Sequence, residues 1–189
     1  MATDIESPNT SPDRPQGLRP RLTGFLRNRS GVAAVEFALI AAPFFFLLFA
    51  MIEVAAVFFM GSVMENAVLE AARDIRTGRA QSSGMSEGAF KNAVCSRISM
   101  LGSCDNVEID VRVFEDFDGV DQSSPISEGE MDTDDFGFDP GDAGDIVLVR
   151  AFYRWKLLTP GFTAALANMD NNEYLVSAAT VFRNEPFDE

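Results

Sequence analysis

Residues 31–60 read GVAAVEFALIAAPFFFLLFAMIEVAAVFFM, and this stretch decides the fold. The run from Phe37 to Ile52 contains sixteen consecutive residues without a polar side chain, and it resumes after Glu53. At about 1.5 Å rise per residue, a helix from Val32 to Met51 spans roughly 30 Å, which is the thickness of the bilayer core. The stretch therefore predicts a transmembrane helix over residues 32–60.

A carboxylate, Glu36, lies five residues after Gly31, close to the start of the apolar run, and Arg27 and Arg29 lie just upstream. An ionisable group at the centre of a membrane helix costs about 2.5–3.5 kcal/mol on insertion scales, and less near its edge. A secretory signal peptide has a shorter apolar region, about 7–15 residues, with its small-residue cleavage site after it. Here the small residue precedes the run, so cleavage after Gly31 would leave the apolar helix as the mature N-terminus.

The segment from Gly31 to Phe37 resembles the processing site of type IV prepilins and pseudopilins. It consists of a glycine, four apolar residues, a glutamate and a phenylalanine, in this order. Within that class the chain resembles the TadE-like pseudopilins (the TadE/TadF family) of tight-adherence, or Flp, pilus machines. The resemblance implies that Gly31, Val32, Glu36 and Phe37 form the processing site of a prepilin peptidase, which cuts after Gly31. TadE-like and TadF-like chains are similar enough that both assignments stay open.

The resemblance also implies that Glu36 and Glu53 act in assembly. The Glu36 carboxylate of one subunit would neutralise the new α-amino group on Val32 of the next. We expect Glu36 in the first helical turn, where the helix dipole favours an anion. TadE-like chains commonly have a glutamate near position 53, which implies a recognition role for it. From the residues alone, Glu36 snorkelling to the interface and Glu53 as an ordinary interfacial residue are the alternatives.

Charge predicts the orientation in a bacterial inner membrane. Residues 1–31 carry five arginines and three acids, whereas the rest of the chain has a net charge of −16. Because arginines next to a membrane stay cytoplasmic, we expect a cytoplasmic N-terminus and a periplasmic C-terminal domain. The leader, residues 1–31, is rich in Ser, Pro, Thr and Arg and is expected to be disordered before it is removed.

The rest of the chain predicts a small α+β domain of the pilin type. An apolar stripe continues the helix over 61–81, with Val63, Met64, Ala67, Val68, Ala71, Ala72 and Ile75 on one face. Within 82–189, a second helix begins near Ser86, and residues 107–113 and 147–157 alternate as strands, with a third strand at 174–182. We expect an antiparallel sheet against the amphipathic part of the first helix, with Glu108 and Asp110 facing Arg150 and Arg154.

Cys95 and Cys104 are the two cysteines of the chain. Both fall on the side of the membrane expected to be oxidising, which predicts a disulfide between the second helix and the first strand. The chain has no histidine, and two thiols do not complete a tetrahedral shell, so we expect no metal site at the cysteines.

An acidic loop spans residues 115–145, with twelve acids, five glycines and no lysine or arginine. Calcium binding is an alternative because hard ions prefer carboxylates, but Phe136 and Ala143 occupy positions where an EF-hand loop needs oxygen ligands. A mobile, solvated loop is favoured. Residues 140–147, PGDAGDIV, resemble a turn before the valine-rich strand of TadE-like chains, which implies a turn here.

These observations favour assembly over catalysis. We expect no enzyme, because there is no histidine, nucleophile elbow or phosphate-cradling loop, and no nucleic-acid partner, because the domain is strongly acidic. The resemblance implies a minor pseudopilin rather than the much smaller fibre subunit. Its expected partners are the prepilin peptidase, other pilins and pseudopilins, the inner-membrane assembly machinery and the lipid bilayer, and no cofactor is expected. The alternative is an unprocessed single-pass anchor whose acidic periplasmic domain binds another envelope protein.

Overall fold

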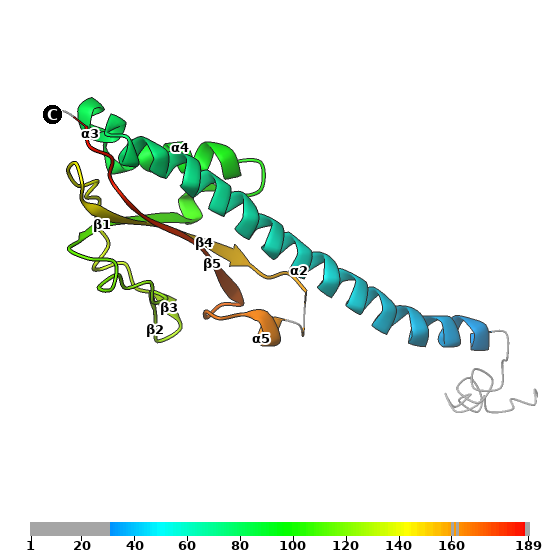
Figure 1. Ribbon diagram of the computed structural model, residues 1–189. Helices are drawn as coiled ribbons and strands as arrows, with labels where there is room; N and C mark the ends of the chain where they lie inside the picture. Colours follow the sequence, from blue (N-terminus) through cyan, green and yellow to red (C-terminus); the bar gives the residue numbers. More distant parts are fainter. Residues whose placement is uncertain (1–30, 160, 162, 188–189) are drawn as a thin grey trace, which may run out of the picture. The chain divides into compact units, whose positions relative to one another are not determined.

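The structure is a computed structural model that describes residues 31–159, 161 and 163–187 (Figure 1). The expectation of a disordered leader falls on residues outside this part of the chain, apart from Gly31. The elements in chain order are α2 (Val32–Arg76), α3 (Arg79–Ser83), α4 (Glu87–Ile98), a 3₁₀ turn (Cys104–Asn106), β1 (Val107–Phe114), β2 (Ile126–Ser127), β3 (Glu130–Met131), β4 (Ile146–Lys156), α5 (Thr163–Leu166) and β5 (Glu173–Arg183). The chain divides into two units, residues 1–44 and 45–189.

The first helix, α2, is unbroken from Val32 to Arg76 and includes Pro43 and Gly61. The prediction that the apolar and amphipathic segments form one helix is confirmed as far as Arg76, but the predicted extension to residue 81 was too long, because the chain turns at Gly78. By length and composition, this helix is a candidate membrane span. The helix ends where Gly78 adopts a left-handed conformation, φ 76°, which glycine enters without a steric cost.

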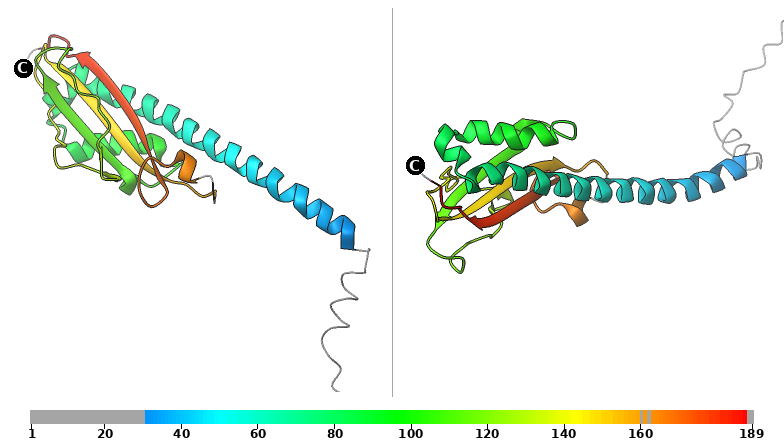
Figure 2. Two further views of the ribbon diagram at one scale, coloured as in Figure 1. Left: turned by 90° about the horizontal axis from the view of Figure 1, so that it is seen from below. Right: turned by 45° about the horizontal axis from the view of Figure 1, so that its top comes forward.

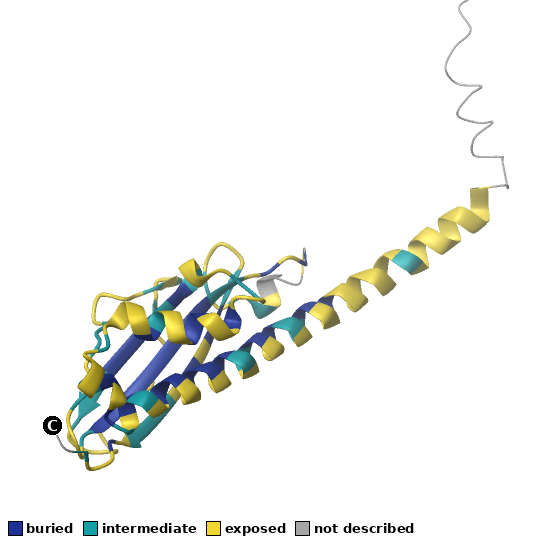
Figure 3. Cartoon of the chain, turned by 90° about the horizontal axis from the view of Figure 1, so that it is seen from above, coloured by how far each residue is buried: buried dark blue, intermediate teal, exposed yellow. Residues whose placement is uncertain are grey.

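One stripe of α2 is buried, and it begins well before the predicted amphipathic segment. All members of the predicted stripe are buried except Val63, which is half-buried. The stripe also includes Ala50, Glu53, Val57 and Met60, at intervals of three or four residues, so it keeps one helical face turned to the domain. In Figure 3 the dark buried residues follow one side of the helix. Residues 31–49 are exposed apart from Ala41, which is half-buried.

The sheet has the strand order β1-β4-β5, and all neighbours are antiparallel. Alternation in β1 and β4 gives the sheet an apolar face, which packs with α2 and α4 into one core that includes Val111 and Val149. In Figure 2 the two helices lie on the same side of the strands. The predicted fold class, an α+β domain with an antiparallel sheet after a long apolar helix, is confirmed.

The second helix, α4, begins where predicted. The Ser86 hydroxyl accepts a hydrogen bond from the backbone N–H of Ala89 at 3.3 Å and so caps the helix. Phe90, Val94 and Ile98 are buried on its inner face. The turn after it carries Cys104, whose disulfide to Cys95 is present as predicted, with 5.6 Å between the two Cα atoms. A short helix, α3, was not predicted; it lies between Gly78 and Gly84, which both adopt the left-handed conformation.

The acidic loop is solvated only in part, which corrects the expectation of a free loop. Its aspartates are exposed, except for a half-buried Asp145, but two phenylalanines attach it to the domain. Phe136 stacks on Phe152 with ring centroids 5.3 Å apart, and Phe138 lies 5.6 Å from Phe90. Hydrogen bonds between Val111 and the backbone of residues 137 and 139 extend the β1 edge of the sheet. Ring contacts and backbone hydrogen bonds therefore attach this highly charged segment to the domain.

Candidate processing and assembly site

The predicted processing residues lie at the very start of α2. Gly31 directly precedes the first helical residue, Val32, and a Cβ atom placed on Gly31 would meet nothing within 4 Å. Val32 is 48% exposed and Phe37 is 70% exposed, and Glu36 is exposed as well. These side chains are accessible to a macromolecule.

Glu36 lies one residue beyond the first turn of α2, which contains no acidic residue. The expectation of a first-turn position was wrong because a turn takes about 3.6 residues and Glu36 is the fifth. Val32 and Glu36 are i and i+4 neighbours and share one helix face. Glu36 belongs to the first unit of the chain and Glu53 to the second.

Glu53 binds the backbone of the segment after β4. Its carboxylate accepts hydrogen bonds from the N–H groups of two consecutive residues, Leu158 and Thr159, the latter at 3.0 Å. The Glu53 side chain is buried, with 7% of its surface exposed. The domain itself covers the Glu53 side chain, which the interpretation as an ordinary interfacial residue did not include.

Spacing was the signal that could have located Glu53 correctly. Counted backward from Met64, the buried stripe runs through Met60, Val57 and Glu53. A carboxylate in line with a buried stripe has to find donors, because burying an unpaired charge is costly. Backbone donors in a strand-to-helix connection leave no sequence pattern, so the partners could not be predicted.

An apolar pocket of about 410 Å³ opens beside Glu53. Two segments line it, one from α2 and one from the end of β4 and the residues after it. The lining consists of Phe46, Phe49, Ile52, Glu53, Ala56, Trp155, Leu158 and Thr159. Its volume lies in the range that is usual for small-molecule sites, about 300–1,000 Å³.

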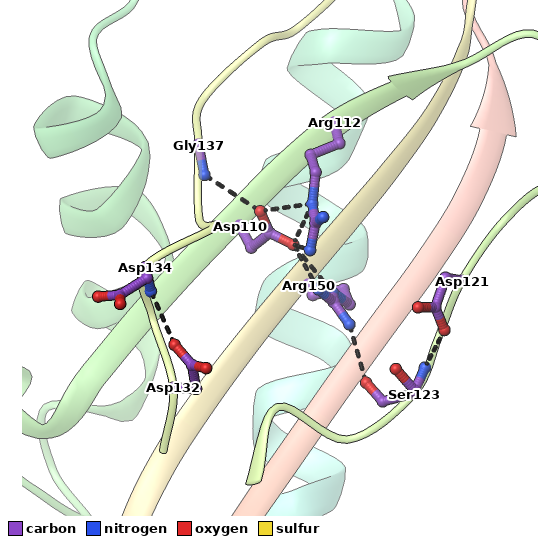
Figure 4. Close-up of polar contacts among 8 residues, drawn as sticks. All are labelled: Asp110, Arg112, Asp121, Ser123, Asp132, Asp134, Gly137 and Arg150. Atoms are coloured by element: carbon purple, nitrogen blue, oxygen red, sulfur yellow. Dashed lines mark hydrogen bonds and ion pairs between the residues drawn. The ribbon is translucent and has the colours of Figure 1, made fainter. Parts of the chain in front are cut away.

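A second polar cluster lies on the face of the sheet opposite the helices (Figure 4). Asp110 is fully buried and pairs with Arg150, its direct neighbour on β4, through two hydrogen bonds of 2.7 and 3.0 Å. Arg112 and the backbone N–H of Gly137 also donate to this carboxylate. Arg150 in turn donates to the carbonyl of Ser123 at 2.9 Å. The predicted pairing of Asp110 with Arg150 is confirmed, and it connects the acidic loop to the sheet.

Arg150 also lies beside Phe136 and Phe152, two aromatic rings that stack on each other. Its guanidinium lies 5.3 Å from the ring centroid of Phe152 and 5.9 Å from that of Phe136. Such placement adds cation–π attraction to the ion pair. Glu108, the other acid predicted to cross the sheet, lies within 4.0 Å of Arg154 and 3.4 Å of Lys91.

Asp121 lies next to this cluster and is exposed. The backbone N–H of Ser123 donates to the Asp121 carboxylate at 2.8 Å and holds its pKa below the ordinary aspartate value. The Ser123 hydroxyl and the positive charges of Arg150 and Arg112 act in the same direction. Hydrogen bonding to the charged form is the usual cause of such a shift.

Other aspartates of the acidic loop accept hydrogen bonds within its turns. Asp132 accepts from the backbone N–H of Asp134, and Asp139 from that of Gly141. Asp145 accepts from the N–H of Asp142 in the turn that was expected over residues 140–147. In the described part of the chain, no group of three or more His, Cys, Asp or Glu residues is arranged to hold a metal ion.

Residues 31–73 match the model of the family described as TadE-like protein. The match begins at Gly31 and ends inside α2. It therefore covers the predicted processing residues and Glu53 but not the sheet. The resemblance noted from the sequence is confirmed for this segment. No curated protein and no solved structure matches the chain. The family match indicates a role in tight-adherence (Tad) pilus assembly.

Proposed function

We propose that the protein is a minor pseudopilin that a prepilin peptidase cuts after Gly31 and that acts in the assembly of a tight-adherence (Flp-type) pilus. The observation that carries the proposal is the coincidence of two boundaries. The family match starts at Gly31, and α2 begins one residue later, at the exposed Val32. A peptidase that cuts there needs an accessible glycine followed directly by an apolar helix.

In this proposal α2 crosses the bacterial inner membrane once, with the N-terminus in the cytoplasm and the sheet domain in the periplasm. The arginines before Gly31 and the charge of −16 after it favour that orientation. The disulfide between Cys95 and Cys104 supports it independently, because disulfides persist in the oxidising periplasm and are rare in the cytoplasm.

Assembly would proceed by helix packing. The exposed residues 32–49 offer an apolar surface to the helices of other pilins and pseudopilins and to lipid. After cleavage, Glu36 of one subunit would pair with the α-amino group of Val32 in the next and so set the axial stagger between them. In the membrane an unpaired charge is costly, which gives this pairing its specificity. The chain acts in this way as a structural partner of the inner-membrane assembly machinery and not as an enzyme.

The competing function is an unprocessed single-pass anchor with an acidic periplasmic interaction domain. The two functions can be distinguished with a Gly31→Leu variant that is expressed with and without a prepilin peptidase. Since a side chain at Gly31 meets no neighbour, this variant should fold as the wild type does. Gly24→Leu, the same change seven residues upstream, is the matched control.

We expect wild type and Gly24→Leu to lose residues 1–31 only when the peptidase is present, and Gly31→Leu to stay intact. Only the processed proteins should support pilus assembly. Pilus assembly by an intact Gly31→Leu protein would contradict the proposal and favour the anchor.

A further inference from the structure

The geometry points to a lipid-binding site: we propose that the pocket beside Glu53 takes an acyl chain of a phospholipid in the outer leaflet of the inner membrane. The inference rests on the membrane insertion of α2 that is part of the proposed function. It does not depend on cleavage after Gly31.

The position of the pocket along α2 is the first argument. About 20 helical residues cross the hydrocarbon core, and the twentieth residue of α2 is Met51. The helical part of the pocket wall runs from Phe46 to Ala56, so it begins before Met51 and ends after it along the helix. With Val32 at the cytoplasmic boundary, the pocket opens at the boundary between the outer leaflet and the periplasm.

The chemistry of the wall is the second argument. Apart from Glu53 and Thr159, the pocket is lined by apolar and aromatic side chains. Both oxygens of the Glu53 carboxylate accept backbone N–H groups, so the charge of this lining residue is engaged by the protein itself. Trp155, the single tryptophan of the chain, is half-buried in the wall, and tryptophan favours the headgroup level of a bilayer.

Exposed apolar side chains beside the pocket, among them Leu158, also support a lipid chain as the occupant. The backbone N–H of Leu158 is bound by Glu53, and its side chain is 78% exposed beside the pocket. On α2, Phe49 and Ile52 are exposed next to it, at 57% and 56%. Exposed apolar side chains from two elements form one surface that is continuous with the candidate span. A lipid chain covers such a surface at the level where the domain meets the bilayer.

Quenching of Trp155 fluorescence by brominated phospholipids tests the site directly. The purified full chain is reconstituted in phosphatidylcholine vesicles, with acyl chains either unmodified or brominated near the glycerol end. Because the chain has a single tryptophan, all of the signal comes from the pocket wall. Ala56→Phe fills the pocket, and Ala55→Phe makes the same change at an exposed neighbour outside its lining.

We expect brominated chains to quench roughly half of the wild-type fluorescence, because an indole at the interface contacts the chains. Ala55→Phe should be quenched equally and Ala56→Phe clearly less. Equal quenching of both variants and wild type would overturn the proposal. Weak quenching that rises on dilution into excess lipid would also overturn it and would identify a second copy as the occupant.

Vesicle flotation separates this proposal from the proposed function. A protein that floats with the vesicles but shows no quenching would remove the acyl-chain site and leave membrane insertion in place. A protein that does not float would contradict the membrane insertion on which both rest.

Discussion

The carboxylate of Glu53 accepts the backbone N–H of Thr159 at 3.0 Å, across 106 positions of the sequence. With the parallel bond to Leu158, this contact fixes the end of β4 to α2. The sheet domain is therefore joined to the long helix by a charged hydrogen-bonded contact in addition to the apolar stripe. This contact lies near the expected membrane boundary and fixes the sheet domain to α2 there.

Glu53→Ala should lower the free energy of unfolding of the domain by about 1–3 kcal/mol, because two backbone donors lose their acceptor. Glu53→Gln, which keeps one acceptor oxygen, should cost less. Denaturant unfolding in detergent, followed by circular dichroism, measures both. Glu65→Ala, an exposed glutamate on the same helix, is the control, and an equal loss there would refute the special role of Glu53.

Asp110→Leu should be far more damaging, by about 3–5 kcal/mol, because it leaves the Arg150 guanidinium buried without its main counter-charge. The double variant Asp110→Leu with Arg150→Met should recover much of this loss, since no unpaired charge remains. The same unfolding measurement applies to both. A double variant as unstable as the single one would show that the ion pair is not the reason for the loss.

Reduction of the disulfide between Cys95 and Cys104 should cost roughly 2–3 kcal/mol, as the chain-entropy model gives for a short loop. Adding a reductant during thermal unfolding should therefore lower the wild-type midpoint. The variant with both cysteines changed to alanine should have the same unfolding midpoint with and without reductant. A reductant effect that persists in that variant would assign the change to another cause.

The Asp121 carboxyl should titrate below the ordinary aspartate value, about 3.9, because the Ser123 backbone N–H stabilises its charged form. Its folded-state pKa is below the unfolded one, so its contribution to stability is present above the unfolded pKa and disappears as the pH falls through the folded value. An NMR pH titration measures the pKa. Ser123→Pro removes the N–H donor and should raise the pKa, more than Ser123→Ala does.

Local patterns explain which features could be predicted. The apolar run of α2, the Ser86 cap and the alternation in β1 and β4 each follow from a short repeat or a single capping residue, so the sequence contains them directly. The ion pair of Asp110 with Arg150 could be predicted because the two strands that carry these residues could be paired from their patterns. The resemblance to TadE-like chains rested mainly on the residues from Gly31 to Phe37 and on the apolar run that follows them.

Contacts between distant segments explain what could not be predicted. The donors to Glu53 are backbone groups of a connecting segment, and backbone groups are the same in every sequence. Phe136 and Phe138 attach the acidic loop to the sheet, yet the charge around them indicated solvation. The extension of the buried stripe to Ala50 depends on how far the sheet reaches along α2, which no local repeat determines.

Processing after Gly31 determines which residue forms the N-terminus of the membrane-extracted wild-type protein, and this residue can be identified with and without a prepilin peptidase. We expect Val32 at the N-terminus when the peptidase is present and Met1 or Ala2 when it is absent. Met1 or Ala2 in both preparations would contradict processing and leave a single-pass anchor with an interaction domain.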